Sequence, residues 1–144
     1  MKPPAWRQDA ALYPHSVRVQ TRYHDEDRLG HVNNIAVAAY YDEARSQLMR
    51  RTFELTNGLT GVRIVTADVR VSYQGEVFHP GDVEVFSGIL RIGNSSWEIG
   101  QTMYQAGRCV GVATTVLVQA SSEGSSTIVP ALRAALEQLI VVAP

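Results

Sequence analysis

The stretch that decides the fold reads DEDRLGHVNN and runs from Asp25 to Asn34. It gathers acidic residues, a glycine, an imidazole and two amides into one short polar segment. A pattern typical of a helix follows at once, rich in alanine and tyrosine, from about Ile35 to about Leu55. Asn57-Gly58 ends this pattern, because both residues tolerate the left-handed backbone conformation found beyond helix C-termini.

The acids of this stretch precede the start of a helix, where backbone N–H groups have no partner within the helix. Such N–H groups stabilise negative charge. An acid beside them can serve the hydrolysis of an acyl group, because that reaction develops charge on an oxygen atom.

Length and composition exclude several classes of protein. A chain of 144 residues is long enough for one domain with a real core. The net charge of -1 argues against a nucleic-acid partner, which needs a basic surface. The single Cys109 cannot form an internal disulfide and favours an intracellular, cytoplasmic location. Neither a signal peptide nor an apolar run long enough to span a membrane is found, so no membrane partner is expected.

The rest of the chain reads mostly as strand. Residues 1–12 are expected to form a loose, flexible arm, and 15–22 a short strand. Four further strands are expected after the helix, with a tight hairpin at Gly93-Asn94, over residues 62–73, 83–92, 95–106 and 108–119. The alternation in the last strand puts Val110, Val112, Val116 and Val118 on one face.

A short helix is expected to begin at Pro130, since proline suits the first helical turn. Its apolar face comprises Leu132, Ala135, Leu136 and Leu139. Consecutive strands with short turns predict an antiparallel sheet of about five strands, and the long helix must cover one face of it. The sequence therefore predicts an α+β domain that spans residues 1–144. Several alanines make the long helix slim enough to lie close to the sheet: Ala36, Ala38, Ala39 and Ala44.

The order of elements, with Asp27 followed by GHVNN at 30–34 and YYDEAR at 40–45, resembles the hotdog-fold acyl-CoA thioesterases. The 4-hydroxybenzoyl-CoA thioesterase group is the most similar branch. Acyl-carrier-protein thioesterases of the same fold carry a similar motif. The resemblance covers about residues 15–139. It implies a sheet wrapped around the long helix and pairing into homodimers or homotetramers, with active sites at the subunit interface.

The resemblance also implies a division of roles. The carboxylate of Asp27 would attack the thioester or activate water, and the backbone N–H of Asn34 would hold the thioester oxygen. His31 is a further candidate for acid–base chemistry. No metal and no cofactor are implied, because CoA arrives as part of the substrate. Substrate contacts are expected from Gly30, Val32, Asn33, Val37, Tyr41, Ser95 and Ser96. The chain departs from the family at Val37, Ala38 and Ala39, where larger side chains are common.

Each candidate also has a structural interpretation. Asp27 can cap a turn, His31 can hydrogen-bond the loop, and Asn33 or Asn34 can cap the helix. Asp25 either faces solvent or orders the loop. Ser95 and Ser96 can contact pantetheine or shape the hairpin.

Residues outside the motif are less specific. Glu43 fits an ion pair with Arg45 or Arg50. CoA phosphates need cations, and Arg70, Arg91 and Arg108 are candidates. Cys109 fits a buried, inert thiol. His24 and His79 lack metal-ligand spacing, so no zinc site is expected.

Three functions remain open at this point. The first is hydrolysis of an acyl-CoA to a free acid and CoA. The second is hydrolysis of an acyl chain held by an acyl carrier protein, which predicts a basic docking patch. The third is a hotdog domain that binds acyl-CoA without catalysis.

Overall fold

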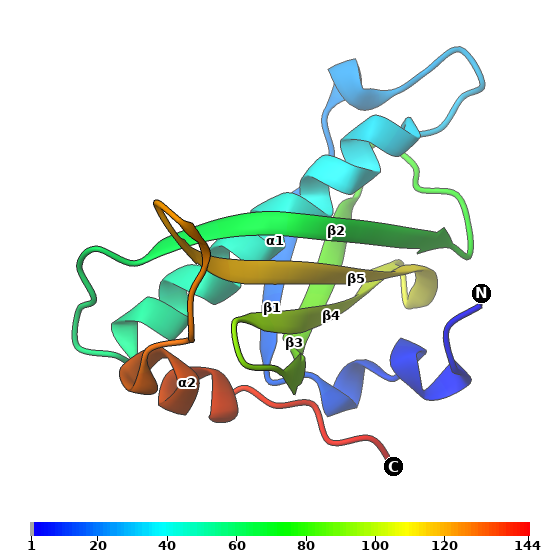
Figure 1. The fold of residues 1–144 in the computed structure, drawn as a ribbon. Coiled ribbons are helices and arrows are strands. Elements are labelled where there is room, and N and C mark those ends of the chain that lie inside the picture. Colours follow the sequence, from blue (N-terminus) through cyan, green and yellow to red (C-terminus); the bar gives the residue numbers. More distant parts are fainter. Residues whose placement is uncertain (1) are drawn as a thin grey trace.

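The computed structural model describes residues 2–144, and one long helix and one sheet dominate it (Figure 1). The helices are α1 (Asn34–Glu54) and α2 (Pro130–Glu137). The strands are β1 (His15–Gln20), β2 (Arg63–Tyr73), β3 (Asp82–Ile92), β4 (Ser96–Gln105), β5 (Arg108–Ser121) and β6 (Gly124–Ser125). Three short 3-10 turns are η1 (Ala5–Gln8), η2 (Ala10–Leu12) and η3 (Tyr23–Asp25).

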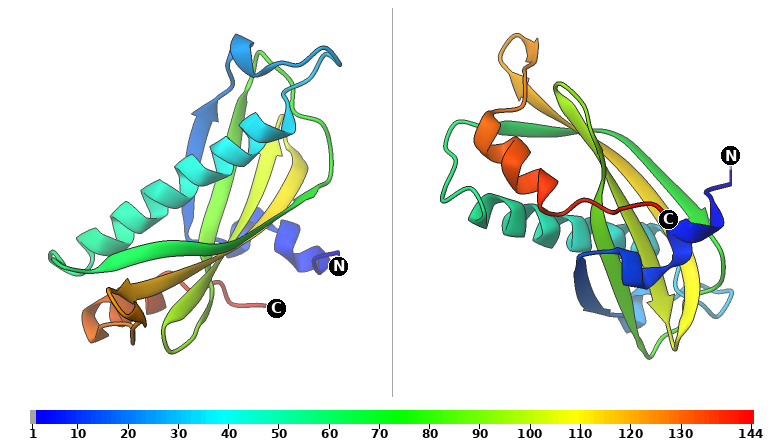
Figure 2. Two further views of the ribbon diagram at one scale, coloured as in Figure 1. Left: turned by 45° about the horizontal axis from the view of Figure 1, so that its top comes forward. Right: turned by 90° about the horizontal axis from the view of Figure 1, so that it is seen from below.

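The strands form one antiparallel sheet in the order β1-β3-β4-β5-β2, and the short β6 pairs with β5. β2 therefore leaves the sequential order and lies at an edge of the sheet. Figure 2 shows α1 along one face of the curled sheet. The expected α+β architecture is confirmed, and all five longer strands lie where the sequence pattern predicts them.

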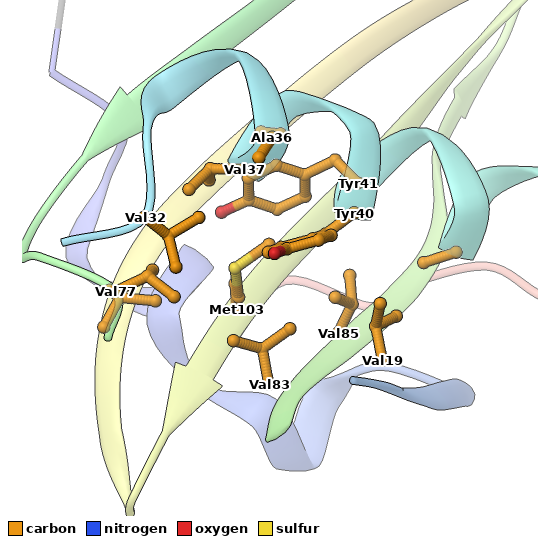
Figure 3. Close-up of a cluster of buried hydrophobic side chains, with 13 residues drawn as sticks. Val19, Val32, Ala36, Val37, Tyr40, Tyr41, Val77, Val83, Val85 and Met103 are labelled. Carbon is orange, nitrogen blue, oxygen red and sulfur yellow. The ribbon is translucent and has the colours of Figure 1, made fainter. Parts of the chain in front are cut away.

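The core has two parts, one under each half of α1. The cluster under the N-terminal half includes Tyr41, Val85 and Met103 (Figure 3). The cluster under the C-terminal half joins Leu48 to the sheet and to α2, where the expected apolar face is buried. The slim helix is confirmed only in part, since Ala36 and Ala44 are buried whereas Ala38 is half-buried and Ala39 is exposed.

The N-terminal segment is packed, in place of the loose arm expected over residues 1–12; Met1 lies outside the described residues. Arg7 is buried and donates to the main-chain oxygen of Ala113 at 2.7 Å and to Thr114 Oγ1 at 3.0 Å. Its Nε also donates to the Tyr13 hydroxyl at 3.0 Å. These bonds hold η1 against β5 and tie it to Tyr13, which follows η2.

The face predicted for β5 is confirmed for Val112, Val116 and Val118, which share one face, and it is wrong for Val110. A register shift on β5, opposite Met103 and Tyr104 of β4, changes which side chains face α1. Val110 lies in the core, but the next core residues are Ala113 and Leu117. A bulge adds one residue to a strand and moves every later side chain to the other face. Val112, Val116 and Val118 therefore do not share the face of Val110.

No helix within residues 2–144 combines the length and the apolar composition needed to cross a membrane.

Candidate active site

The polar loop before α1 is held in place by Asp25. Its carboxylate is buried and accepts hydrogen bonds from Arg22 Nη2 at 3.0 Å, Arg22 Nε at 3.2 Å and the Tyr40 hydroxyl at 2.6 Å. The Arg22 guanidinium, more than Tyr40, holds the pKa of Asp25 below its usual range. Burial and the neighbouring Asp25 carboxylate raise the pKa of Tyr40. Of the two interpretations of Asp25, the loop-ordering one agrees with this geometry.

Asn33 joins this loop to the helix. Its side-chain oxygen accepts from the N–H of Ala36 at 2.8 Å, so Asn33 is the N-cap of α1. Its Nδ2 and its backbone N–H both donate to the main-chain oxygen of Asp25, at 2.7 Å and 2.8 Å. The capping interpretation of Asn33 is therefore confirmed.

The cap leaves two N–H groups free at the start of α1. The Val37 N–H donates to the Asn33 carbonyl at 3.1 Å, and the Ala36 N–H is capped. Within residues 2–144, no partner is found for the N–H of Asn34 or Ile35. These two N–H groups point out of the helix end, where the backbone dipoles favour negative charge.

Asp27 lies in the turn just ahead of this helix end. Its Oδ1 accepts from the N–H of Leu29 at 2.8 Å, and its Oδ2 lies 3.8 Å from His31 Nδ1. The backbone of the turn closes with an Asp27 N–H bond to the His31 carbonyl at 3.0 Å. The Asp27 side chain is 31% exposed, so a water molecule or a substrate can reach it.

His31 links Asp27 to a second acid. Its Nδ1 lies 3.2 Å from the Val32 carbonyl oxygen, and its Nε2 lies 3.8 Å from Glu76 Oε1. The imidazole is 24% exposed and the Glu76 carboxylate 63% exposed. A ring held between two carboxylates at a cavity rim can orient either of them or pass a proton between them.

A cavity of about 280 Å³ opens beside the start of α1. Its apolar wall comprises Val32, Val37 and Val77, and its polar rim comprises His31, Asn34 and Glu76; Tyr73 and Gly75 complete the lining. The Asp27 carboxylate is not part of this lining and lies on the outer side of His31. A second, more open hollow borders Asp27 directly, lined by Tyr23, His24, Glu26, Asp27 and Arg28.

The sequence did not point to four cavity residues, namely Tyr73, Gly75, Glu76 and Val77. They lie at the end of β2 and in the segment that follows it. The N–H of Val32 donates to the Val77 carbonyl at 2.7 Å, which brings this segment against the motif loop. No local sequence pattern predicts this pairing, because the two segments are far apart in the chain.

The structure does not bring every candidate to the cavity. Ser95 and Ser96 lie in the β3–β4 hairpin, at the end of the sheet away from the start of α1, where Ile128 and Arg133 near α2 bond the hairpin backbone. Gly30 adopts a positive φ of 87° in the motif turn and does not line the cavity. Tyr41 is buried behind the apolar wall.

The charged candidates have other partners. Arg45 pairs with Asp42 at 3.2 Å and donates to Gln101. Within residues 2–144, Glu43 forms neither of its expected ion pairs, with Arg45 or with Arg50. Arg70 pairs with Asp68 at 3.3 Å, and Arg91 pairs with Glu98 at 3.3 Å. All three of these pairs leave at least one partner exposed to solvent.

Metal-ligating side chains are scattered. The His79 ring lies 2.9 Å from the Thr21 hydroxyl, and Cys109 is half-buried beside Thr102. Among residues 2–144, no three side chains of His, Cys, Asp or Glu form a group that could hold a metal ion.

Several solved structures share this fold. The PA5185 protein of Pseudomonas aeruginosa strain PAO1 is 28% identical to this chain, with a TM-score of 0.80 and coverage of 94% of this chain and 97% of that one. A thioesterase from Thermus thermophilus, complexed with coenzyme A and Zn, is 27% identical, with a TM-score of 0.77 and coverage of 88% and 94%. No curated protein matches the chain.

A member of the thioesterase superfamily from Jannaschia sp. CCS1, 21% identical, shares the fold with a TM-score of 0.76 and coverage of 88% and 86%. The common architecture is the hotdog fold, in which a curled antiparallel sheet surrounds one long helix. The sequence itself matches the thioesterase-like superfamily over residues 21–136. This match includes the motif loop, the whole of α1 and every strand after it, and the chain therefore belongs to the thioesterase-like superfamily.

Proposed function

We propose that the protein hydrolyses an acyl-CoA thioester to a free acid and CoA. One observation supports this proposal above all: Asn34, whose N–H is free, lines a cavity together with His31, and His31 lies 3.8 Å from the Asp27 carboxylate. An acyl-transfer site needs a donor for the developing oxyanion and a group that attacks or activates water. The coenzyme A bound to the similar Thermus thermophilus thioesterase supports CoA as the carrier of the acyl group.

In the proposed reaction the thioester oxygen lies against the Asn34 N–H, with the acyl group in the cavity. Asp27 either takes a proton from water, which adds to the thioester carbon, or attacks that carbon itself to form an anhydride that water then opens. The C–S bond breaks in both routes, and the sulfur leaves as a thiolate that takes up a proton. His31, 3.8 Å from Asp27 Oδ2, would orient the carboxylate or supply that proton.

We also propose that two copies of the chain pair through β2. This strand has a neighbour on one side only, and an unpaired edge is a template for another strand. Its exposed apolar side chains are Val65, Val69 and Tyr73. Because Tyr73 also lines the cavity, a partner strand along β2 would border the cavity and could bring Asp27 and the acyl group together.

The test is release of free thiol from a panel of acyl-CoAs by wild type and by Asp27→Asn. Loss of a general base or nucleophile costs about 10²- to 10⁴-fold in rate, so kcat should fall by at least about 10²-fold. The variant should stay folded, because an Asn side chain can still accept the Leu29 N–H. Glu123→Gln removes one charge from an exposed loop and should leave the rate unchanged.

Wild-type rates for Asp27→Asn would refute its assigned role. Turnover restricted to acyl chains on a carrier protein would replace CoA as the substrate carrier. Tight acyl-CoA binding without turnover would make the protein a binding domain instead of an enzyme.

A further inference from the structure

Tyr41 carries a hydroxyl group with no partner in the core. Its side chain is fully buried, and no hydrogen bond to the hydroxyl is found within residues 2–144. Buried polar atoms in folded proteins are nearly always hydrogen-bonded, so an exception needs an explanation. Burial raises the pKa of Tyr41, which keeps the phenol protonated and able to donate.

The neighbouring Tyr40 shows that the fold can satisfy such a group. Its hydroxyl donates to Asp25 Oδ2 at 2.6 Å and holds the motif loop. A phenylalanine at position 41 would fill the same space without a polar atom to satisfy. A phenyl ring at this position would therefore pack the free protein as well as Tyr41 does.

The Tyr41 hydroxyl lies on the same side of the core as the apolar wall of the cavity (Figure 3). Tyr41 runs back along α1 toward its N-terminus, and its oxygen lies on the side of the core where Val32 and Val37 lie (Figure 3). Both of these valines line the cavity that opens beside Asn34. Room for the oxygen on the sheet side comes from Gly111, where an added Cβ would lie only 2.6 Å from it.

We propose that Tyr41 is a specificity-determining residue, whose hydroxyl donates to an oxygen atom on the acyl group of the substrate. The substrate class is then an acyl-CoA whose acyl part bears a carbonyl, ether or hydroxyl oxygen. This inference rests on the proposed function and narrows its substrate.

The geometry of α1 predicts how far the acyl oxygen lies from the thioester carbon. Asn34 and Val37 are about 4.5 Å apart along the helix axis, given a rise of about 1.5 Å per residue. Because the Tyr41 side chain reaches back over the preceding turn, its hydroxyl lies near the level of Val37. The acyl oxygen should therefore follow the thioester carbon by about three to five atoms. Because Tyr41 is fully buried, Val32 and Val37 must move apart to admit the acyl group.

The experiment compares matched acyl-CoAs that differ in one oxygen. Wild type is assayed on pentanoyl-CoA and 4-oxopentanoyl-CoA, on hexanoyl-CoA and 5-oxohexanoyl-CoA, and on 4-methylbenzoyl-CoA and 4-hydroxybenzoyl-CoA, which separates chain from ring acceptors. One added hydrogen bond should raise kcat/KM about five- to tenfold for the oxygen-bearing member of at least one pair. Tyr41→Phe should abolish that preference, whereas Tyr40→Phe should retain it.

Equal kcat/KM values within every pair would overturn the assignment of Tyr41 while leaving thioester hydrolysis in place. No turnover of any ester by wild type would overturn the proposed function and this inference together.

Thermal unfolding without ligand provides a second test. Tyr41→Phe should unfold at the same or a higher temperature than wild type, because it removes an unsatisfied buried hydroxyl. Tyr40→Phe should unfold at a lower temperature, because it removes a bond to a carboxylate. A Tyr41→Phe variant that unfolds several degrees lower than wild type would show that the hydroxyl already has a partner, and would overturn the inference.

Discussion

Replacing Asp25 by alanine should destabilise the protein more than the removal of any exposed carboxylate. The substitution deletes the acceptor for Arg22 and leaves the hydroxyl of the buried Tyr40 without a partner. A hydrogen bond to a charged group contributes about 1.5–3 kcal/mol. The Arg22 side chain is 72% exposed, so its pair contributes at most about 1 kcal/mol. We therefore expect Asp25→Ala to lower the free energy of unfolding by about 2–4 kcal/mol.

This cost corresponds to a measurable shift in thermal unfolding. An unfolding entropy of about 2.1 cal/mol/K per residue gives roughly 0.3 kcal/mol/K for 144 residues. The Tm of Asp25→Ala should then fall by about 7–13 °C at neutral pH. Tyr40→Phe should account for most of this loss, and Arg22→Ala for little of it. Asp42→Ala, which breaks an ion pair at a carboxylate that is 78% exposed, is the matched control and should lower Tm by about 3 °C or less.

The same variant has a pH signature. The pKa of Asp25 is lower in the folded than in the unfolded chain. Its ionised form therefore stabilises the fold above the unfolded pKa of about 3.9, and this contribution is lost as the pH falls through the folded pKa. The Tm difference between wild type and Asp25→Ala should be constant from pH 7 to about 5 and should shrink below about pH 4. A Tm loss under about 3 °C, or a difference that grows toward low pH, would refute the reasoning.

Three further predictions concern the helix start, the N-terminal segment and the contact behind the cavity. Asn33→Ala should lower the free energy of unfolding by about 1 kcal/mol, because the N-cap of α1 is lost. It should also lower kcat, because the side-chain bond from Asn33 to the motif loop is lost as well. An unchanged kcat would show that the cap stabilises the fold without contributing to catalysis. Arg7→Ala should make the N-terminal segment sensitive to limited proteolysis, since the bond to the Ala113 carbonyl is lost; equal digestion rates would contradict this. Gly111→Ala should lower the free energy of unfolding, measured in urea, by about 1–3 kcal/mol, because the added Cβ meets the Tyr41 hydroxyl. Much of this loss should disappear when Gly111→Ala is combined with Tyr41→Phe. Fully additive losses in the double variant would show that the two side chains do not touch.

The sequence predicts those parts of the fold that depend on local pattern. The long helix follows from its composition and from Asn57-Gly58 beyond its end, and the apolar spacing of α2 matches its buried face. Asn33 could be recognised as a cap because its residue type and its place before the helix determine that role.

Features that depend on distant partners could not be read in this way. Arg7 looks like a solvated residue until the carbonyl of Ala113 is placed beside it. The register shift on β5 depends on pairing with β4, so alternation alone placed Val110 on the face of Val112, Val116 and Val118. Glu76 and Val77 reach the cavity only because their segment pairs with Val32.

The position of β2 in the sheet has a consequence for the order of folding. β2 pairs only with β5, from Arg63 opposite Ala120 to Tyr73 opposite Gly111, whereas β3, β4 and β5 pair with their neighbours in sequence. The ribosome makes a chain from its N-terminus at about 5–20 residues per second, so β2 emerges well before its partner exists. Until β5 is made, both edges of β2 are open. During that interval the nascent chain can pair with a second copy of itself through β2, the same strand that pairs with a second copy in the proposed dimer of the folded protein.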